Sequence, residues 1–530
     1  MFSLTTVLFP SLNRHFQKRI MSTKVYGVAK NGATMKIELT EVEDKICKVL
    51  QGVSELIAQK RPDLPKIESR IAGGWVRDKL LGNECNDLDV AVNDMMGYEF
   101  ATFVNEHLKN QGVATRNIAK IDSNPEKSKH LETATTKLFD RDVDFCNLRT
   151  EAYEPDSRIP SQITFGTPTE DAYRRDITIN SLFYNVNTNE VEDFTERGIH
   201  DLIYGIIRTP LEPFETFHDD PLRVLRCIRF ASRFNFQMTP ELCEAAKHPQ
   251  IKNALIHKIS RERIGTEFDK MISGPHPLLA LELIQQLELY PIVMKAPEDI
   301  SSGTVGSDQM AVDAVGAVTW LGQQETALTP SSKAEKRTMF LTASVLPFLG
   351  VTVEQKKRFY PGVQSVLRDS IKTNNVDIKT VSSIFQGIPV LAELAKENTQ
   401  RQIKRAELGM IIRELKETWK TAIKCATIKE LLDVYPNAPW SKPKEIQIDN
   451  GVCQKYVDLI KRAEEYGITN CYEWKHLING KRVAEVVGVR PGPDITGLLE
   501  VQMKWQLDNP DGTIEECEKM LSEYWANKKR

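Results

Sequence analysis

The 530-residue chain has no excess of charge, no closely paired cysteines and no long apolar segment. Its 70 basic and 73 acidic residues give a net charge of −3, so any surface that binds nucleic acid must be local. None of the nine cysteines belongs to a Cys-x-x-Cys pair, so neither a zinc site nor a disulfide framework is indicated, and a reducing compartment fits best. The longest uncharged apolar stretch, residues 338–353, is too short to cross a bilayer, and we expect no membrane association.

The composition is that of an ordinary folded protein. Hydrophobic residues make up 41% of the chain and charged residues 27%, which excludes a collagen-like, purely coiled-coil or wholly disordered chain. At roughly 150 residues per domain, the length predicts three or four domain-sized units.

Acidic residues are missing from the N-terminal segment, where the first one is Glu38. Basic residues with interleaved apolar ones precede it, which is typical of a mitochondrial presequence, and we assign residues 1–41 to a basic leader. A second methionine, Met21, would start a shorter form that stays in the cytoplasm or nucleus. A basic tail without a targeting function has the same composition and stays open as an alternative.

The rest of the chain changes pattern partway along. An amphipathic helix at 42–59, a short buried strand at 70–72, an alternating strand at 87–92 and a further strand at 143–148 indicate a mixed α/β unit. Downstream, apolar residues recur at helical spacing, and we expect helices at 221–234, 259–272, 278–289, 403–426 and 452–466.

The predicted fold class is therefore α+β, with a mixed β-sheet in an N-terminal head and helices after it. We divide the chain into a head at 42–187, a helical neck at 188–275, a helical body at 276–400 and a helical body or tail at 401–530. Segments 297–306 and 323–336 are expected to be loops.

Residues 400–445 carry ten basic residues together with Trp419 and Trp440. This combination predicts a local phosphate-binding surface for tRNA. A merely solvated helix face is the alternative.

Asp87 and Asp89 are the first candidates for catalysis. Residues two apart on a strand point to the same face, so both carboxylates can bind one pair of Mg²⁺ ions. Two such ions activate an attacking hydroxyl and stabilise a leaving phosphate, the chemistry of polymerases. We expect a third carboxylate from Asp144, although Asp142 has the same parity and spacing alone does not choose between them. An Asp-x-Asp pair also occurs by chance on solvated strands.

A glycine pair precedes the acidic strand. Gly73 and Gly74, between a strand and a helix start, allow backbone N–H groups to approach a phosphate, and Arg77 can add a charged contact. No Gly-x-x-x-x-Gly-Lys-Ser/Thr sequence occurs, so a P-loop does not hold the phosphate. A plain tight turn is the alternative.

Arg174, Arg175, Asp176 and Asn180 begin a segment rich in apolar residues, which we expect to be a helix. Two guanidinium groups at a helix start oppose the helix dipole, so the pattern favours an anionic partner. These groups are positioned for a triphosphate or a ribose.

The most informative segment is 219–230. Pro221 at the first helical position makes Asp220 a natural N-cap, which is the purely structural interpretation. Asp220 and Arg223 are also three apart and offer an acceptor beside a donor. Cytosine and adenine present an amino donor next to a ring acceptor, whereas uracil and guanine clash, so this pair can select C and A without a template. We group with the nucleotide-binding residues the other charged members of the segment, Asp219, Arg226 and Arg229.

Together these residues resemble the class II tRNA nucleotidyltransferases, or CCA-adding enzymes, which build the CCA end of tRNA from CTP and ATP. The resemblance covers about residues 71–271, and the leader is similar to that of a fungal enzyme. Four motifs carry it: Gly73-Gly74-x-Val76-Arg77-Asp78 with Asp87-x-Asp89, Arg174-Arg175-Asp176-x-x-x-Asn180, Asp201-x-x-x-Gly205-x-x-Arg208, and Asp219-Asp220-x-x-Arg223. One position departs from the family pattern, because Asp219 stands where the family has Glu, and its role stays open.

The resemblance implies roles for these motifs. The Asp87 and Asp89 pair would hold the catalytic metals, the Arg-Arg-Asp stretch would recognise the ribose and phosphates, and Asp220 with Arg223 would pair with the incoming base. It also implies a head with a five-stranded sheet, helices elsewhere, and the tRNA 3′ end, CTP and ATP as partners. We expect a monomer.

Two other functions share these motifs. A template-free poly(A)-type polymerase has the same head chemistry. A catalytically silent RNA-binding relative is the other alternative, and the intact aspartate pair argues against it, because a silent head need not keep a costly cluster of like charges.

Overall fold

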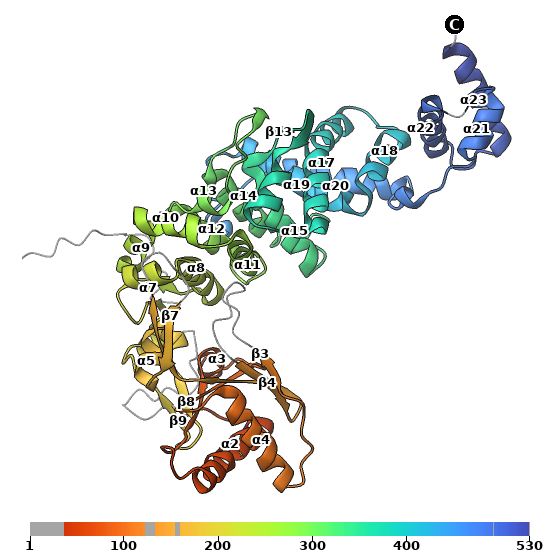
Figure 1. The fold of residues 1–530 in the computed structure, drawn as a ribbon. Coiled ribbons are helices and arrows are strands. Elements are labelled where there is room, and N and C mark those ends of the chain that lie inside the picture. The colour runs from red at the N-terminus through yellow and green to blue at the C-terminus, as the bar shows by residue number, and fades with distance from the viewer. Residues whose placement is uncertain (1–35, 122–132, 154–159, 491, 529–530) are drawn as a thin grey trace, which may run out of the picture. The chain divides into compact units, whose positions relative to one another are not determined.

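The computed structural model describes residues 36–121, 133–153, 160–490 and 492–528 (Figure 1). The chain divides into two compact units, Met1–Met271 and Ile272–Arg530. The predicted leader lies almost entirely outside the described residues. Within the described part of the chain, no helix is long and apolar enough to cross a membrane.

A mixed sheet forms the centre of the first unit, with the strand order β3-β4-β5-β2-β1-β8-β9. β2 and β5 run parallel, and the other neighbouring strands run antiparallel. The predicted strands at 70–72, 87–92 and 143–148 are confirmed as β1, β2 and β5. The strands are β1 (Ser69–Ala72), β2 (Leu88–Val92), β3 (Ala119–Ile121), β4 (Thr133–Leu138), β5 (Arg141–Asn147), β8 (Phe183–Asn185) and β9 (Glu190–Glu192).

The described part of the sheet has seven strands, not the five that the resemblance implies. The sheet also continues past residue 187, where we placed the end of the head, because β9 pairs with β8 through a short polar hairpin. Strands of three residues at a sheet edge show almost no alternation, so the sequence pattern did not reveal them.

Two helices, α2 (Glu41–Lys60) and α4 (Gly97–Asn110), pack against each other and against the sheet (Figure 1). α2 confirms the amphipathic helix expected at 42–59. It begins with a capping box between Thr40 and Glu43. The Glu43 carboxylate also accepts hydrogen bonds from Trp75 Nε1 at 3.0 Å and Lys79 Nζ at 2.8 Å, which ties α2 to α3.

The remainder of the first unit combines a β-hairpin with short helices. Its elements are α3 (Gly74–Leu80), β6 (Arg149–Tyr153), β7 (Pro160–Phe165), α5 (Pro168–Tyr173), α6 (Gly198–Tyr204), β10 (Ile206–Ile207), α7 (Pro213–Asp219), α8 (Leu222–Phe234), β11 (Gln237–Met238), α9 (Pro240–Lys247), α10 (Pro249–Lys258) and α11 (Arg261–Ile272). The helices expected at 221–234 and 259–272 are confirmed as α8 and α11.

The second unit is mainly helical, as expected. Its principal helices are α12 (Pro277–Gln286), α13 (Tyr290–Val293), α14 (Asp308–Leu321), α15 (Lys333–Ser344), α16 (Gly362–Ser365), α17 (Asn375–Gln400), α18 (Arg405–Leu415), α19 (Trp419–Val434), α20 (Gly451–Glu465), α21 (Gly480–Val487), α22 (Pro493–Asp508) and α23 (Ile514–Lys528). The single helix expected at 403–426 is wrong, because the chain turns at Lys416 (φ +51°) and forms α18 and α19 in its place.

The second unit also holds a three-stranded antiparallel sheet of β12 (Ile300–Ser302), β13 (Thr352–Gln355) and β14 (Arg358–Pro361). The expected loop at 297–306 therefore contains a strand. β12 finds its partner some fifty residues downstream, where Ser301 Oγ donates to Thr352 O at 3.2 Å. A pairing at that sequence distance leaves no local signal.

The structure removes three side chains from the phosphate-binding surface expected at 400–445. Trp419 and Trp440 are only 3% and 1% exposed, so neither can stack on a ligand. Lys424 is also buried and forms an ion pair with Glu335 at 2.8 Å. Trp419 and Lys424 belong to the buried face of α19, and Trp440 lies in the segment that follows this helix.

Candidate active site

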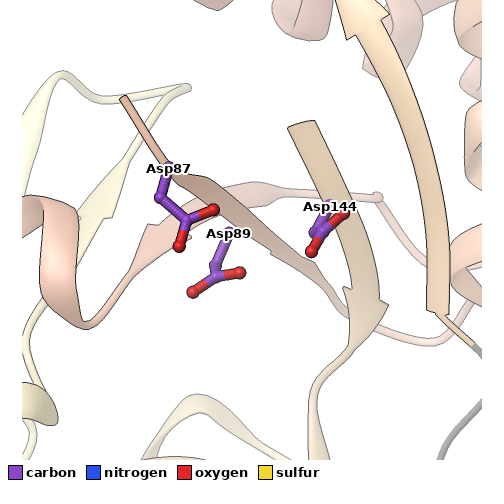
Figure 2. A group of neighbouring side chains, drawn as sticks. All are labelled: Asp87, Asp89 and Asp144. Atoms are coloured by element: carbon purple, nitrogen blue, oxygen red, sulfur yellow. The ribbon is translucent and has the colours of Figure 1, made fainter. Parts of the chain in front are cut away.

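Asp87, Asp89 and Asp144 lie together on two neighbouring strands (Figure 2). Asp89 of β2 pairs in register with Asp144 of the parallel strand β5, and Asp87 directly precedes β2. One carboxylate oxygen from each residue lies within 4.8 Å of the other two. Asp142 instead forms an ion pair with Lys137 at 2.7 Å. Of the two aspartates that spacing left open, the structure brings Asp144 to the Asp87 and Asp89 pair.

The electrostatics of this cluster suit a cation. Partial withdrawal of Asp89 from water and the negative charges of Asp87 and Asp144 raise the pKa of Asp89 to about 6, while Arg175 acts in the opposite direction. Thr135 Oγ1 donates to Asp144 at 2.6 Å and orients this carboxylate. Three convergent carboxylates are hard oxygen ligands of the kind that Mg²⁺ prefers, and a bound cation would relieve their repulsion.

Gly73 forms the sharp turn from β1 into α3 at φ +68°. A Cβ atom at this position would lie 2.9 Å from Nη1 of Arg175 and 3.3 Å from the carbonyl oxygen of Asn180. The positive φ favours glycine, and the main-chain oxygen of Asn180 leaves little room for a Cβ atom. The turn therefore packs directly against the Arg-Arg-Asp segment, and Gly74 begins α3.

Arg77 is held in place by neighbouring side chains. Its side chain is buried, and Nε donates to Asp78 at 2.8 Å. Its Nη1 donates to the side-chain oxygen of Asn180. The guanidinium carbon lies 5.3 Å and 4.8 Å from the ring centroids of Phe230 and Phe234, so Arg77 joins α3 to α8.

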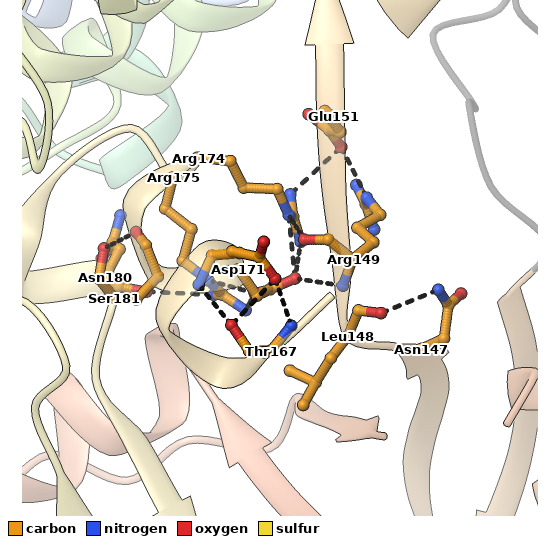
Figure 3. A network of polar contacts seen from close by, with 12 residues as sticks. Asn147, Leu148, Arg149, Glu151, Thr167, Asp171, Arg174, Arg175, Asn180 and Ser181 are labelled. Atoms are coloured by element: carbon orange, nitrogen blue, oxygen red, sulfur yellow. Dashed lines mark hydrogen bonds and ion pairs between the residues drawn. The ribbon is translucent and has the colours of Figure 1, made fainter. Parts of the chain in front are cut away.

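Arg174 and Arg175 follow the end of a helix, so the helix start expected here is wrong (Figure 3). α5 begins at a capping box on Thr167 and ends at Arg174, and a short 3₁₀ turn (Thr178–Asn180) leads into β8. Residues 177–183 are rich in apolar side chains because they are buried, not because they are helical. At the carbonyl end of α5 the two guanidinium groups interact favourably with the helix dipole.

One buried carboxylate that sequence reasoning missed, Asp171, holds both arginines (Figure 3). Its Oδ1 accepts a hydrogen bond from Arg174 Nε at 2.9 Å, and its Oδ2 accepts from Arg175 Nε and Nη2 at 3.0 and 2.9 Å. Burial opposes its ionisation, but the charges of Arg175 and Arg174 outweigh burial and lower the pKa of Asp171. The i, i+3 and i, i+4 spacing was the available signal.

Asp176 links the sheet region to α8. Its Oδ2 accepts from Arg226 Nε at 2.7 Å and Nη2 at 2.6 Å, and its Oδ1 accepts from Asn180 Nδ2 at 3.1 Å. Burial opposes ionisation, but Arg226 and Asn180 outweigh it and lower the pKa of Asp176 to about 2. These three predicted nucleotide-binding residues form one polar network.

Asp220 and Arg223 are held by different partners. Asp220 Oδ2 accepts from Arg263 Nη2 at 2.9 Å, whereas Arg223 Nη2 donates to the main-chain oxygen of Arg174 at 2.7 Å. Asp220 Oδ1 also accepts from the Leu222 N–H at 3.2 Å, so the expected capping contact at the start of α8 exists. Sequence reasoning missed Arg263, which lies 43 residues downstream.

Asp219 and Arg229 differ in their exposure to solvent. Asp219 ends α7, and its partial burial raises its pKa, while Arg223 acts in the opposite direction. Arg229 is buried, donates to Glu267 at 2.5 Å and lies 4.0 Å from the Phe230 ring centroid. Arg229 therefore packs α8 against α11.

Comparisons with known proteins agree with this arrangement. Residues 69–208 match the model of the poly A polymerase head domain, and residues 235–300 match the model described as the probable RNA and SrmB-binding site of polymerase A. The chain is 40% identical over 516 residues to the mitochondrial CCA tRNA nucleotidyltransferase of Saccharomyces cerevisiae, covering 91% of this chain and 92% of the relative. It is 35% identical over 486 residues to tRNA nucleotidyltransferase cca1 of Schizosaccharomyces pombe, covering 91% and 95%.

The fold has solved counterparts. A CCA-adding enzyme in its apo form II aligns with a TM-score of 0.59 at 19% identity, over 90% of this chain and 96% of the other. The mixed sheet with its three clustered aspartates thus defines the head of a nucleotidyltransferase. With two relatives at 35% and 40% identity over nine-tenths of its length, the chain belongs to the family of CCA tRNA nucleotidyltransferases. The family resemblance and the α+β fold class are confirmed.

Proposed function

We propose that this protein adds CCA to the 3′ end of tRNA from CTP and ATP, with its own side chains selecting the nucleotides. The cluster of Asp87, Asp89 and Asp144, with the charge of Arg175 acting on Asp89, is the observation that carries this function. Solved structures with the same fold support this proposal. They include complexes of a CCA-adding enzyme with CTP and with ATP, and a complex of the Thermotoga maritima CCA-adding enzyme with tRNA.

Asp87 and Asp89 would hold Mg²⁺ through carboxylate oxygens that share one face. When bound, the metal supplies positive charge that stabilises the leaving phosphate and favours deprotonation of the tRNA 3′-hydroxyl. Asp144 would complete the ligand set or take the proton of that hydroxyl, since its Oδ1 is already oriented by Thr135. The raised pKa of Asp89 fits a carboxylate cluster poised for a cation.

Arg174 and Arg175 would bind the triphosphate. Their side chains are 17% and 19% exposed, and Asp171 holds both guanidinium groups, while Glu151 also contacts Nη1 of Arg174 at 3.3 Å. An arginine with one edge fixed presents its other N–H groups in a defined direction, which suits phosphate recognition. Arg175 Nη1 donates to the Asn180 carbonyl at 3.1 Å and is positioned against the Gly73 turn.

Asp220 and Arg223 would read the base. The acceptor of Asp220 and the donors of Arg223 match the amino and ring-nitrogen edges of cytosine and adenine. Arg263 orients the Asp220 carboxylate for this contact. The side chain of Asp219 is one methylene shorter than the glutamate that the family has at this position. Its partial burial beside Arg223 suits a role in supporting the base contact of Arg223.

The site of action would be both organellar and cytoplasmic. Relatives named as mitochondrial enzymes support a mitochondrial form, which we assign to initiation at Met1. Initiation at Met21 would leave the protein in the cytoplasm or nucleus, because most of the basic leader is then absent. Fluorescent fusions that carry only one of the two start codons test this, and a Met1-only fusion confined to the cytosol would refute it.

A single incorporation assay tests the activity. Purified protein is incubated with tRNA that lacks CCA, with CTP and ATP separately and together, and the 3′ ends are sequenced. Addition of two C and one A supports the proposal. A tail of A only would support the poly(A)-type polymerase, and no incorporation would support the silent RNA-binding relative.

A further inference from the structure

The second unit carries a β-hairpin that the proposed function does not use. β13 and β14 are joined by a two-residue turn, Lys356-Lys357, and the pair is extended by β12. All residues assigned to catalysis and nucleotide binding lie in the first unit. Figure 1 shows β13 among the helices of the second unit.

The turn has an unfavourable backbone for its residues. Lys356 and Lys357 have φ angles of +52° and +62°. Two-residue hairpin turns of this kind strongly favour Asn-Gly or Asp-Gly, because both positions require positive φ. Two consecutive lysines here reduce the stability of the hairpin, and backbone strain of this kind occurs preferentially at functional sites.

The tip combines cations with an exposed aromatic ring. Lys356, Lys357 and Arg358 are all exposed, and no described carboxylate forms an ion pair with them. The next residue, Phe359, is 68% exposed. The strand pairs Phe359 with Glu354, which is also exposed.

The hairpin is anchored on one face only. Val353 is buried, and its cross-strand partner Tyr360 is half-buried, so this face packs on the helical core. Side chains alternate along a strand, which places Phe359 and Glu354 on the opposite face, toward solvent. The ring is therefore held in water by a hairpin whose other face is fixed.

We infer that this hairpin tip is a docking site for the RNA substrate. The two turn lysines would contact phosphates, and Phe359 would stack on an unpaired base, the combination that proteins use to bind single-stranded or looped RNA. One exposed ring is far too small for the roughly 800 Å² per partner of a standard protein interface, whereas it is the right size for one base. That the RNA is tRNA rests on the proposed function.

Full-length variants test the inference through the salt dependence of tRNA binding. K356N/K357G removes two charges but installs the residues that the turn prefers, so its thermal stability should equal or exceed that of the wild type. Its affinity for tRNA lacking CCA should fall about tenfold, and the slope of log K against log salt should decrease by nearly two. F359A should weaken binding about fivefold or more and leave that slope unchanged.

The matched control is K372A/K379A, which removes two exposed lysines elsewhere in the second unit. It should bind tRNA like the wild type. The inference is overturned if the hairpin variants bind tRNA with wild-type affinity and slope, or if the control weakens binding as much as K356N/K357G does. CCA addition by the wild type is measured in parallel. An inactive wild type refutes the proposed function, whereas an active wild type with unaffected hairpin variants refutes only the docking site.

Discussion

Asp220 forms an ion pair with Arg263 of α11, in which Asp220 Oδ2 lies 2.9 Å from Arg263 Nη2. Arg223, one helical turn after Asp220, is held instead by the main-chain oxygen of Arg174. The acceptor and the donor proposed to read the base therefore have separate supports, one from the neck and one from the sheet region. Each can be altered without releasing the other.

Asp220→Asn should relax nucleotide selection. The amide oxygen still accepts from the Leu222 N–H, but the amide can turn its NH₂ toward the base and donate to the carbonyl oxygen of uracil. A lost contact of this kind is worth about 1–3 kcal/mol, so discrimination against UTP should fall by roughly 5- to 150-fold. Single-nucleotide incorporation with all four nucleotides measures this. A folded, active variant still restricted to CTP and ATP would contradict base reading and leave only the capping role.

Asp89→Ala should abolish incorporation of both CTP and ATP, by roughly 10²- to 10³-fold or more, because the cation site loses a ligand. tRNA binding should change little, since affinity for RNA rests on basic contacts. Asp142→Ala is the matched control, because Asp142 has the parity of Asp144 but pairs with Lys137. The assignment of Asp89 as a metal ligand would be contradicted by near wild-type activity of Asp89→Ala, or by equal losses of activity in both variants.

Asp171→Asn should raise KM for CTP and ATP together. The amide cannot accept hydrogen bonds from both arginines through two charged oxygens, so Arg174 and Arg175 lose their fixed orientation. We expect KM to rise by about 10- to 100-fold, in line with the loss of one or two charged hydrogen bonds. Glu170→Gln on the same helix is the control, because Glu170 only completes the cap at Thr167. A change confined to one nucleotide would argue against shared triphosphate binding.

Arg226→Ala should destabilise the first unit. It leaves the buried Asp176 without its counter-charge, and breaking such a pair costs about 3–5 kcal/mol. Urea unfolding followed by circular dichroism measures the loss. Asp176→Asn in the Arg226→Ala background should recover part of it, because the neutral amide no longer needs a cation. A loss below about 1 kcal/mol would mean that the pair is dispensable for folding.

Glu282 in α12 provides a pH test of the second unit. It is partly buried, and burial raises its pKa to about 7. The folded-state pKa exceeds the unfolded one, so folding favours the neutral carboxyl. The contribution of this group to the free energy of unfolding is fully present below its unfolded pKa and is lost as pH rises through about 7. Glu282→Gln should therefore stabilise the protein by about 1–3 kcal/mol at pH 8 and have little effect near pH 4.5. Equal effects at both pH values would contradict the shift.

Short-range patterns proved reliable wherever the relevant neighbours are close in the chain. The spacing of apolar residues predicted α2, α8 and α11, and the parity of Asp87 and Asp89 predicted two carboxylates on one face. The spacing of apolar residues gave wrong predictions at two places. At 174–183 an apolar run was taken for a helix, and at 403–426 two helices were taken for one. Burial by distant elements produces such runs without helical structure.

The sequence by itself thus determined the head-then-helices order, the aspartate pair and the family, because local periodicity and motif spacing encode them. Only the tertiary structure decided that Asp144 joins the pair, that Asp171 holds both arginines, and that Arg77 and Arg229 are buried in packing. The pairs that anchor the site span large gaps, 50 residues for Asp176 and Arg226 and 43 for Asp220 and Arg263. Which partners meet across such gaps depends on how the sheet and α8 pack, and no local spacing carries that information.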